Sequence, residues 1–198
     1  IAFTGGTHTA REIIKNSSNN FAATNLELGG KSPLIVFEDA DIESAANGII
    51  AGNFGASGQS CVAGSRVIVH KNITQELIKL IEKKAQSIVV GDPLNPKTNL
   101  GPLCTIKQIH LIEETLKKSI EQGGGIIFGG KKIEQDGNYF EPTLIHCPNR
   151  QIETLKVEMF GPVISIIEFD SEEEAIEISN DSKYGLGSGL FTKDLARA

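Results

Sequence analysis

The chain has 198 residues, of which 39% are hydrophobic and 22% are charged, and it carries a net charge of -6 at pH 7. This balance is typical of a folded globular protein and excludes extended disorder. The acidic balance excludes the basic surface that nucleic acids and anionic membranes require, and no apolar run approaches the roughly 20 residues of a membrane span. We therefore predict a cytoplasmic protein whose partners are small molecules, with no nucleic acid or membrane among them.

The number and spacing of the cysteines limit which disulfides and metal sites the chain can form. The three cysteines are Cys61, Cys104 and Cys147. Their odd number and wide spacing argue against a disulfide framework and against a four-cysteine zinc site, so we predict no metal centre. Cys104 and Cys147 stand in no motif, and we interpret them as structural residues.

The two ends of the chain indicate a part of a longer protein. The sequence begins at Ile1 without an initiator methionine, and its single methionine is Met159. Residues 192–198 have the pattern of a helix that has just begun. We expect further residues on both sides.

The first predicted elements lead into two pairs of glycines. Residues 1–7 have the pattern of a buried strand that turns through the first pair into a helix over 9–15. Free N–H groups at such a helix start can hold dinucleotide phosphates, although an ordinary tight turn has the same pattern. Residues 21–28 predict a strand that runs into the second pair. Glu27, near the end of that strand, is either a solvated edge residue or a base held near a cleft.

A loop of small residues over 54–66 follows a predicted strand over 34–37 and a predicted helix over 42–52. Cys61 stands in this loop among glycines, serines and alanines. A thiolate nucleophile requires a small, polar setting, because backbone N–H groups supply partial positive charge. The sequence therefore predicts that Cys61 is the nucleophile.

Strands and helices alternate through the rest of the chain. Strand patterns cover residues 66–70, 126–128, 139–145, 163–169 and 188–191, and helical patterns cover 74–89, 105–122 and 171–179. Because Pro142 cannot donate a ladder hydrogen bond, we expect its strand at a sheet edge. The alternation predicts an α/β fold with a mostly parallel sheet flanked by helices. Glu158, just before a Gly-Pro turn, is either a surface acid or a ligand contact.

Four stretches, in this order, resemble the aldehyde dehydrogenase superfamily. They are Phe3-Thr4-Gly5-Gly6, then Leu26-Glu27-Leu28-Gly29-Gly30-Lys31-Ser32-Pro33, then Gly58-Gln59-Ser60-Cys61 with Ala63-Gly64-Ser65-Arg66, and Glu158-Met159-Phe160-Gly161-Pro162. The resemblance covers essentially the whole chain and indicates the NAD(P)-dependent, hydrolytic type. It implies that residues 1–26 are the last edge of a Rossmann-like dinucleotide-binding domain and that residues 27–198 are a catalytic domain, incomplete at its C-terminal end. It also implies a homodimer or homotetramer.

The resemblance implies a mechanism as well. Cys61 would attack a small aldehyde, and hydride would pass from the resulting thiohemiacetal to NAD or NADP, leaving a thioester on the sulfur. Glu27, as a partly desolvated carboxylate, would activate the water that hydrolyses this thioester. The implied cofactor contacts are Gly5 and Gly6 near the nicotinamide half, Leu28 beside the ring, Glu158 at the ribose hydroxyls and Phe160 nearby.

Three alternatives stay open at this point. Coenzyme A could take the acyl group in place of water, although an intact Glu27 favours hydrolysis. Cys61 could serve a cysteine hydrolase or acyltransferase together with a histidine, but none of the four histidines stands in a comparable loop. The chain could also be a non-catalytic fragment. It lacks the asparagine that helps to hold the oxyanion in this family, so we expect the isolated chain to be inactive.

Overall fold

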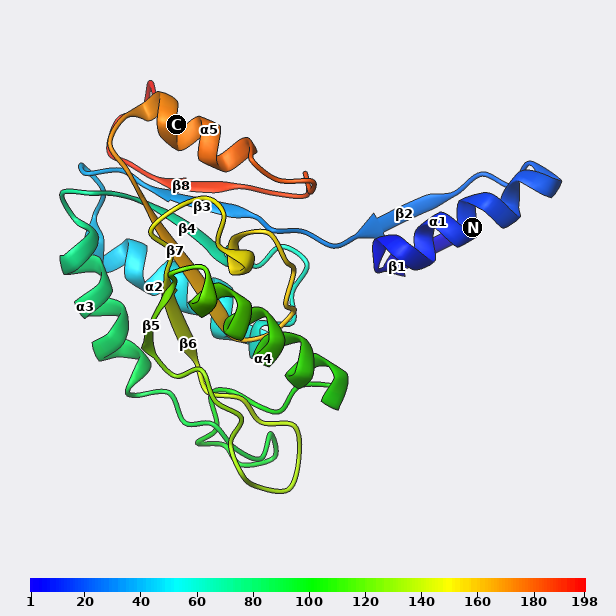
Figure 1. Cartoon of the computed structure of the whole chain (residues 1–198), viewed down its shortest axis with the longest axis horizontal. Helices are drawn as coiled ribbons and strands as arrows, with labels where there is room; N and C mark the ends of the chain where they lie inside the picture. The colour runs from blue at the N-terminus through cyan, green and yellow to red at the C-terminus, as the bar shows by residue number, and fades with distance from the viewer.

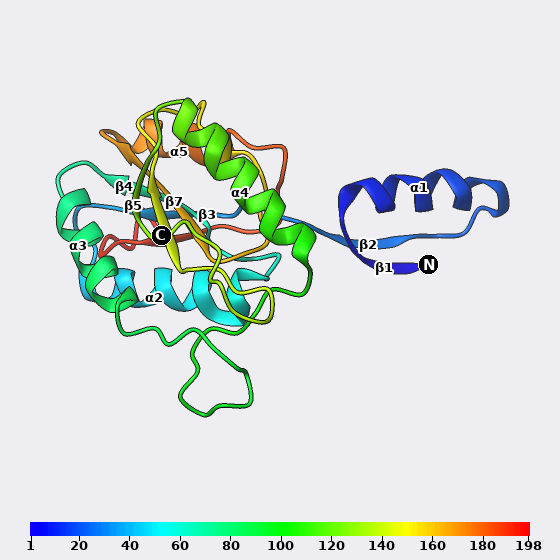
Figure 2. The same cartoon turned by 60° about the horizontal axis from the view of Figure 1, so that its bottom comes forward.

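The computed structural model describes residues 1–198, which form a small N-terminal unit and a larger body (Figure 1). The N-terminal unit contains β1 (Ala2–Gly5), α1 (Thr7–Ser17), the short 3-10 helix η1 (Ser18–Asn20) and β2 (Asn25–Leu28). Its two strands pair in parallel, and α1 lies along them. Figures 1 and 2 both show this unit projecting from the body, to which the segment after β2 connects it.

The body is built on one six-stranded sheet with the order β5-β6-β7-β4-β3-β8. Its strands are β3 (Pro33–Val36), β4 (Arg66–His70), β5 (Gly125–Phe128), β6 (Thr143–His146), β7 (Val163–Phe169) and β8 (Gly189–Phe191). Every neighbouring pair is parallel except β5 with β6. The predicted α/β fold with a mostly parallel sheet is therefore confirmed.

Helices cover both faces of this sheet, as Figure 2 shows. The helices α2 (Ile42–Phe54) and α3 (Thr74–Ala85) pack on one face, and α4 (Ile106–Glu121) and α5 (Glu172–Asn180) pack on the other. In β4, Val67 and Val69 belong to the core beneath α2 and α3, whereas Ile68 belongs to the core beneath α4 and α5. Successive side chains of a strand point to opposite faces, so a continuous apolar run is buried on both sides.

The structure corrects three predicted elements. The strand expected over 21–28 begins only at Asn25, because Phe21 has a left-handed backbone with φ of 56° that ends the preceding helical turn. The helix expected over 74–89 ends at Ala85, after which Val90 pairs with Leu100 in an isolated bridge.

The third correction concerns the strand expected over 139–145, which begins only at Thr143 and is not at an edge. β6 lies between β5 and β7 and begins at Thr143. Pro142 precedes the strand, so its missing N–H removes no hydrogen bond from the ladder. The Thr143 N–H instead donates to the carbonyl of Pro162 at 2.9 Å.

A buried arginine fastens the sheet to α5. Arg66, at the start of β4, is 2% exposed and donates to the carbonyls of Ile178 and Ser179 at 2.6 and 2.7 Å. Its Nε donates to the carbonyl of Lys31 at 3.2 Å. A cation is favourable at the carboxyl end of a helix. These bonds also hold the residues before β3 against the sheet.

Candidate active site

The loop that carries Cys61 has a strained backbone. After α2, the short 3-10 helix η2 (Gly55–Gly58) contains Ala56 and Ser57 with φ of 49° and 56°. A left-handed conformation costs roughly 1–2 kcal/mol for a residue with a side chain. The Ser57 hydroxyl donates to the carbonyl of Gly101 at 2.9 Å and so helps to hold this shape. The surroundings therefore fix the backbone of the loop that carries Cys61.

Gly58 lets this loop lie against the segment that carries Glu158. Its φ is 73°, and a Cβ atom at this position would stand 2.2 Å from the carbonyl carbon and oxygen of Gly161. We expect Gly58→Ala to lower the free energy of unfolding by about 2–4 kcal/mol, because both the backbone angle and the overlap with main chain oppose it. Gly55→Ala is the matched control, since its Cβ would meet no atom within 4 Å. Denaturant unfolding of the protein that contains this chain tests the prediction, and equal midpoints for the two variants would contradict it.

A cavity of about 560 Å³ lies where the N-terminal unit meets the Cys61 loop. Its walls include every predicted site residue, namely Gly5, Gly6, Glu27, Leu28, Cys61, Glu158 and Phe160. The remaining wall residues are Thr4, Gly29, Gln59, Ser60, Gln108 and Leu111. The fold thus brings the four motifs to one place.

The small sheet of the N-terminal unit aligns the first two motifs. In the parallel register of β1 and β2, Thr4 lies beside Glu27 and Gly5 lies beside Leu28. Gly6 follows as the N-cap of α1, and no side chain caps this helix. The N–H groups of the first turn of α1 are therefore available at the carboxyl edge of the two strands.

Glu158 reaches the cavity by resting on the glycine pair after β2. Its Oε1 accepts a hydrogen bond from the Gly30 N–H at 2.9 Å, and its Oε2 lies 2.0 Å from the position of a Cβ atom on Gly29. Only a residue without a side chain leaves room for the carboxylate here. Phe160 follows with a φ of 50° and is 37% exposed.

Cys61 and Glu27 differ in exposure. Cys61 is half-buried, and its carbonyl oxygen is so close to Gly30 that a Cβ atom there would stand 2.5 Å away. Glu27 is exposed in this chain. The expectation of a partly desolvated Glu27 carboxylate is therefore wrong for this structure.

Two glutamines for which the sequence predicted no role form hydrogen bonds that hold segments of the cavity wall in place. Gln108 donates from Nε2 to the carbonyl of Met159, next to Glu158. Gln59 accepts at Oε1 from the N–H of Cys104 at 3.0 Å. Gln59 belongs to the motif that contains Cys61, which marked its position, whereas Gln108 is one of several polar residues on α4 and had no distinguishing signal.

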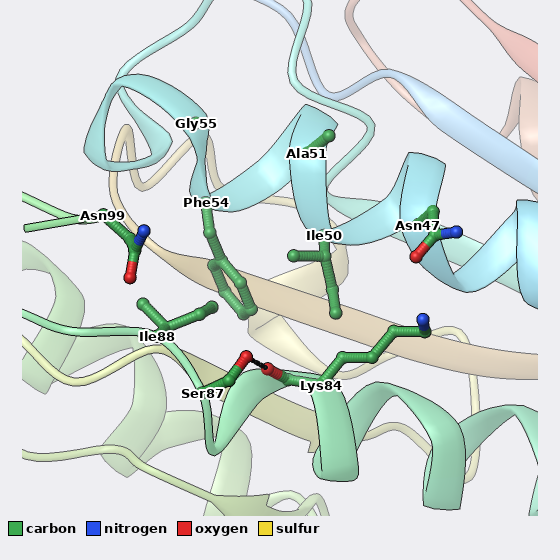
Figure 3. A pocket seen from close by; sticks show the side chains of 9 residues that line it. All are labelled: Asn47, Ile50, Ala51, Phe54, Gly55, Lys84, Ser87, Ile88 and Asn99. Carbon is green, nitrogen blue, oxygen red and sulfur yellow. Dashed lines mark hydrogen bonds between the residues drawn. The ribbon is translucent and has the colours of Figure 1, made fainter. Parts of the chain in front are cut away.

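A second cavity, of about 430 Å³, lies between α2 and α3 (Figure 3). Figure 3 shows Ile50 and Phe54 of α2 on one side and Ile88 on the other. None of the predicted site residues lines it, and its ionisable residue, Lys84, is paired with Glu43. This cavity offers neither a free base nor a thiol, so we assign the candidate active site to the cavity at Cys61.

Other chemistry in the chain is limited. All three cysteines are free, and Cys147 is buried whereas Cys104 is exposed. No group of three or more His, Cys, Asp or Glu side chains converges on a point where a metal ion could bind. None of the helices combines the length and the apolar character that a membrane span needs.

Known proteins match the chain over its whole length. The model described as the aldehyde dehydrogenase family matches residues 1–198. A (Z)-2-((N-methylformamido)methylene)-5-hydroxybutyrolactone dehydrogenase of Acinetobacter baylyi is 47% identical over 199 residues, and a betaine aldehyde dehydrogenase of Rhizobium leguminosarum is 37% identical over 201 residues. Both alignments include 100% of this chain, which spans only 41% of the length of either relative.

Solved structures share the fold. PnpE from Pseudomonas sp. WBC-3 superposes with a TM-score of 0.96 at 43% identity, and PnpE has also been solved in complex with nicotinamide adenine dinucleotide. Betaine aldehyde dehydrogenase from Staphylococcus aureus, in complex with NAD+, superposes with a TM-score of 0.95 at 36% identity. These superpositions cover 100% of this chain and 41% or 40% of the two proteins.

Proposed function

The chain belongs to the aldehyde dehydrogenase family, and on this premise we propose that the protein containing it oxidises an aldehyde to a carboxylic acid with NAD(P)+. One observation carries the proposal: Cys61, Glu27 and the expected cofactor contacts line a single cavity of about 560 Å³. Cys61 belongs to the body and Glu27 to the N-terminal unit. A shared cavity lets a nucleophile and a base act on one substrate.

Cys61 is the proposed nucleophile. Its thiolate adds to the aldehyde carbon, and the resulting thiohemiacetal gives up hydride to become a thioester on the sulfur. Bound NAD(P)+ supplies the hydride acceptor. The backbone N–H of Cys61 stabilises the oxyanion that forms at the aldehyde oxygen.

Glu27 is the proposed general base. It takes a proton from the water that attacks the thioester, and the carboxylic acid product leaves Cys61 free. A base in the same cavity as the nucleophile favours hydrolysis over transfer of the acyl group to coenzyme A, because a thiol acceptor does not need an activated water.

The residues of the cavity fit a dinucleotide. Glu158 uses Oε1 on the Gly30 N–H, so Oε2 can accept from ribose hydroxyls. The uncapped first turn of α1, after Gly5 and Gly6, can face a phosphate. Leu28 and Phe160 offer apolar surface to the nicotinamide. We propose NAD as the cofactor, since PnpE and the Staphylococcus aureus enzyme have been solved with it.

We also propose a domain organisation. Residues 1–26 are assigned to the last edge of a dinucleotide-binding domain and residues 27–198 to a catalytic domain. The separate sheet of β1 and β2 supports a division in this region, with β2 continuing to Leu28. A homodimer or homotetramer is proposed from family membership alone.

Cofactor reduction by the protein that contains this chain tests the proposal. Each aldehyde of a panel, betaine aldehyde among them, is incubated with NAD+ or NADP+, and absorbance of the reduced nicotinamide is followed in the absence of coenzyme A. We expect turnover with at least one aldehyde and the corresponding acid as product. Turnover that requires coenzyme A would favour the acylating alternative, and no reduction with any aldehyde would contradict the proposal.

Gly29→Ala tests the place of Glu158. The added methyl group would overlap Glu158 Oε2 and displace the carboxylate, which is the end of a flexible side chain, so the fold should survive. We expect the KM for NAD(P)+ to rise about tenfold with little change in Tm, because a charge-assisted contact to the ribose is lost. Gly185→Ala is the control, since its Cβ would meet no atom within 4 Å. A KM that stays at the parent value in Gly29→Ala would argue against a ribose contact by Glu158.

A further inference from the structure

A buried lysine stands directly behind the proposed cofactor site. Lys31 follows the glycine pair on which Glu158 rests and is only 2% exposed. Its carbonyl accepts a hydrogen bond from Arg66 Nε at 3.2 Å, whereas its amine forms no hydrogen bond or ion pair within the chain. Burying an ammonium group is costly unless an opposite charge or several hydrogen bonds compensate it. A lysine at this position therefore requires a reason other than packing.

The surroundings of the Lys31 amine contain one carboxylate. The ionisable groups whose charges act on the pKa of this amine are Cys147 after β6, Arg66 of β4 and Glu158 of the segment after the short 3-10 helix η3 (Glu153–Leu155). Burial raises the pKa of Cys147 to about 11, so this group is a neutral thiol at neutral pH. Arg66 is itself a cation. Glu158 is therefore the one partner of opposite charge.

Lys31 and Glu158 border the same small space. Lys31 and Glu158 both line a cavity of about 10 Å³ beneath the Cys61 loop, and Ser60 and Ser65 contribute to its wall. A cavity of this size has room for about one water molecule, and such a water can link two charged groups. Lys31 does not line the larger cavity of the candidate active site, so any effect on the cofactor passes through Glu158.

We propose that Lys31 is a positioning residue whose buried ammonium group holds the Glu158 carboxylate against Gly30 and so aims it at the cofactor ribose. This inference rests on the proposed function, because it assumes that Glu158 binds the ribose. The proposal also explains why a charge is buried here. The Lys31 ammonium group lowers the stability of the fold, but it orients the Glu158 carboxylate for cofactor binding.

The charge of Lys31 changes close to neutral pH. Burial lowers the pKa of Lys31 from 10.5 to about 7, with the positive charge of Arg66 acting in the same direction and the negative charge of Glu158 opposing. The ammonium form, which attracts Glu158, prevails below pH 7 and is lost above it, so cofactor affinity should fall as the pH rises through 7. In the unfolded chain the amine keeps its proton to higher pH. Lys31 therefore destabilises the fold fully below pH 7, where folding buries the charged ammonium group, and this cost declines as the pH rises from 7 towards 10.5.

Lys31→Met removes the charge and keeps the length of the side chain. The dissociation constant of the better-bound of NAD+ and NADP+ is measured calorimetrically from pH 6 to pH 8.5, together with Tm, in the protein that contains this chain. At pH 6 we expect the dissociation constant to rise about three- to tenfold and its pH dependence near 7 to disappear. Tm at pH 6 should stay equal or increase, because a buried charge is gone.

Lys156→Met is the matched control. Lys156 is an exposed lysine on the same segment as Glu158, and its Nζ donates to Gln151 at 2.8 Å. This variant should keep the parent affinity and pH profile. A loss of both affinity and Tm in Lys31→Met would overturn the inference, because a purely structural residue behaves in that way, and an unchanged pH profile would overturn it too. Failure of the parent to bind either cofactor would instead refute the proposed function, and the inference with it.

Discussion

Replacing Cys61 by alanine is expected to lower kcat for aldehyde oxidation at least about 10⁴-fold. Without the sulfur no thiohemiacetal forms, and the bound aldehyde has no covalent route to the oxidised acyl state. Cys61 is half-buried, so the smaller side chain should leave the fold intact. The measurement is the initial rate of reduced nicotinamide formation with the best aldehyde, in the protein that contains this chain.

Two controls separate loss of chemistry from loss of structure. Cys104→Ala should keep the parent rate, because Cys104 is an exposed thiol whose backbone N–H, not its sulfur, contacts Gln59. Cys61→Ala should bind NAD(P)+ as the parent does. If Cys61→Ala kept more than about 1% of the parent rate, the role of nucleophile would have to be withdrawn.

Glu27→Gln is expected to lower the steady-state rate about 10²- to 10⁴-fold while the first turnover survives. The amide has the shape of the carboxylate but cannot take a proton from water, so the thioester accumulates on Cys61. Rapid mixing should show a burst of reduced nicotinamide close to one equivalent per active site, followed by slow turnover. Hydroxylamine, which attacks a thioester without a base, should restore turnover.

The matched control for Glu27 is another exposed acid of the N-terminal unit. Glu12 lies on α1 and forms only a surface pair with Lys15 at 4.0 Å, so Glu12→Gln should keep the parent rate. Loss of the burst in Glu27→Gln would show that Glu27 acts before hydride transfer, and parent-like turnover would remove it from the mechanism altogether.

Much of the fold could be predicted because its elements carry their own periodicity. Ile109, Ile112 and Leu116 recur at helical spacing, and all three are buried on the face of α4 that packs against the sheet. β4 and β7 are apolar runs because both faces of the sheet are covered. The errors arose where neighbours in space set the outcome. Pro142 suggested an edge, but its strand starts one residue later and lies between two others.

The site could be predicted as a set of residues, and its geometry could not. Each motif contains residue types suited to one chemical role, such as a thiol among small residues, an acid beside glycines, or an acid before a Gly-Pro turn. Exposure follows from what covers a residue, so Glu27 proved to be exposed although it stands in an apolar strand end. Gln108 had no signal of its own, since its contact with the carbonyl of Met159 depends on how α4 packs.

By itself, the sequence determined the alternation of strands and helices, the glycines at the turns, and the four motifs with their resemblance to one family. Only the tertiary structure decided that the motifs share one cavity, that Glu158 rests on Gly30 and that the lysine after this glycine pair is buried. The physical reason is the distance along the chain over which each kind of interaction acts. Helical and strand periods act over a few residues, whereas the contact between Glu158 and Gly30 joins positions 128 apart in the chain, which only the packed fold brings together.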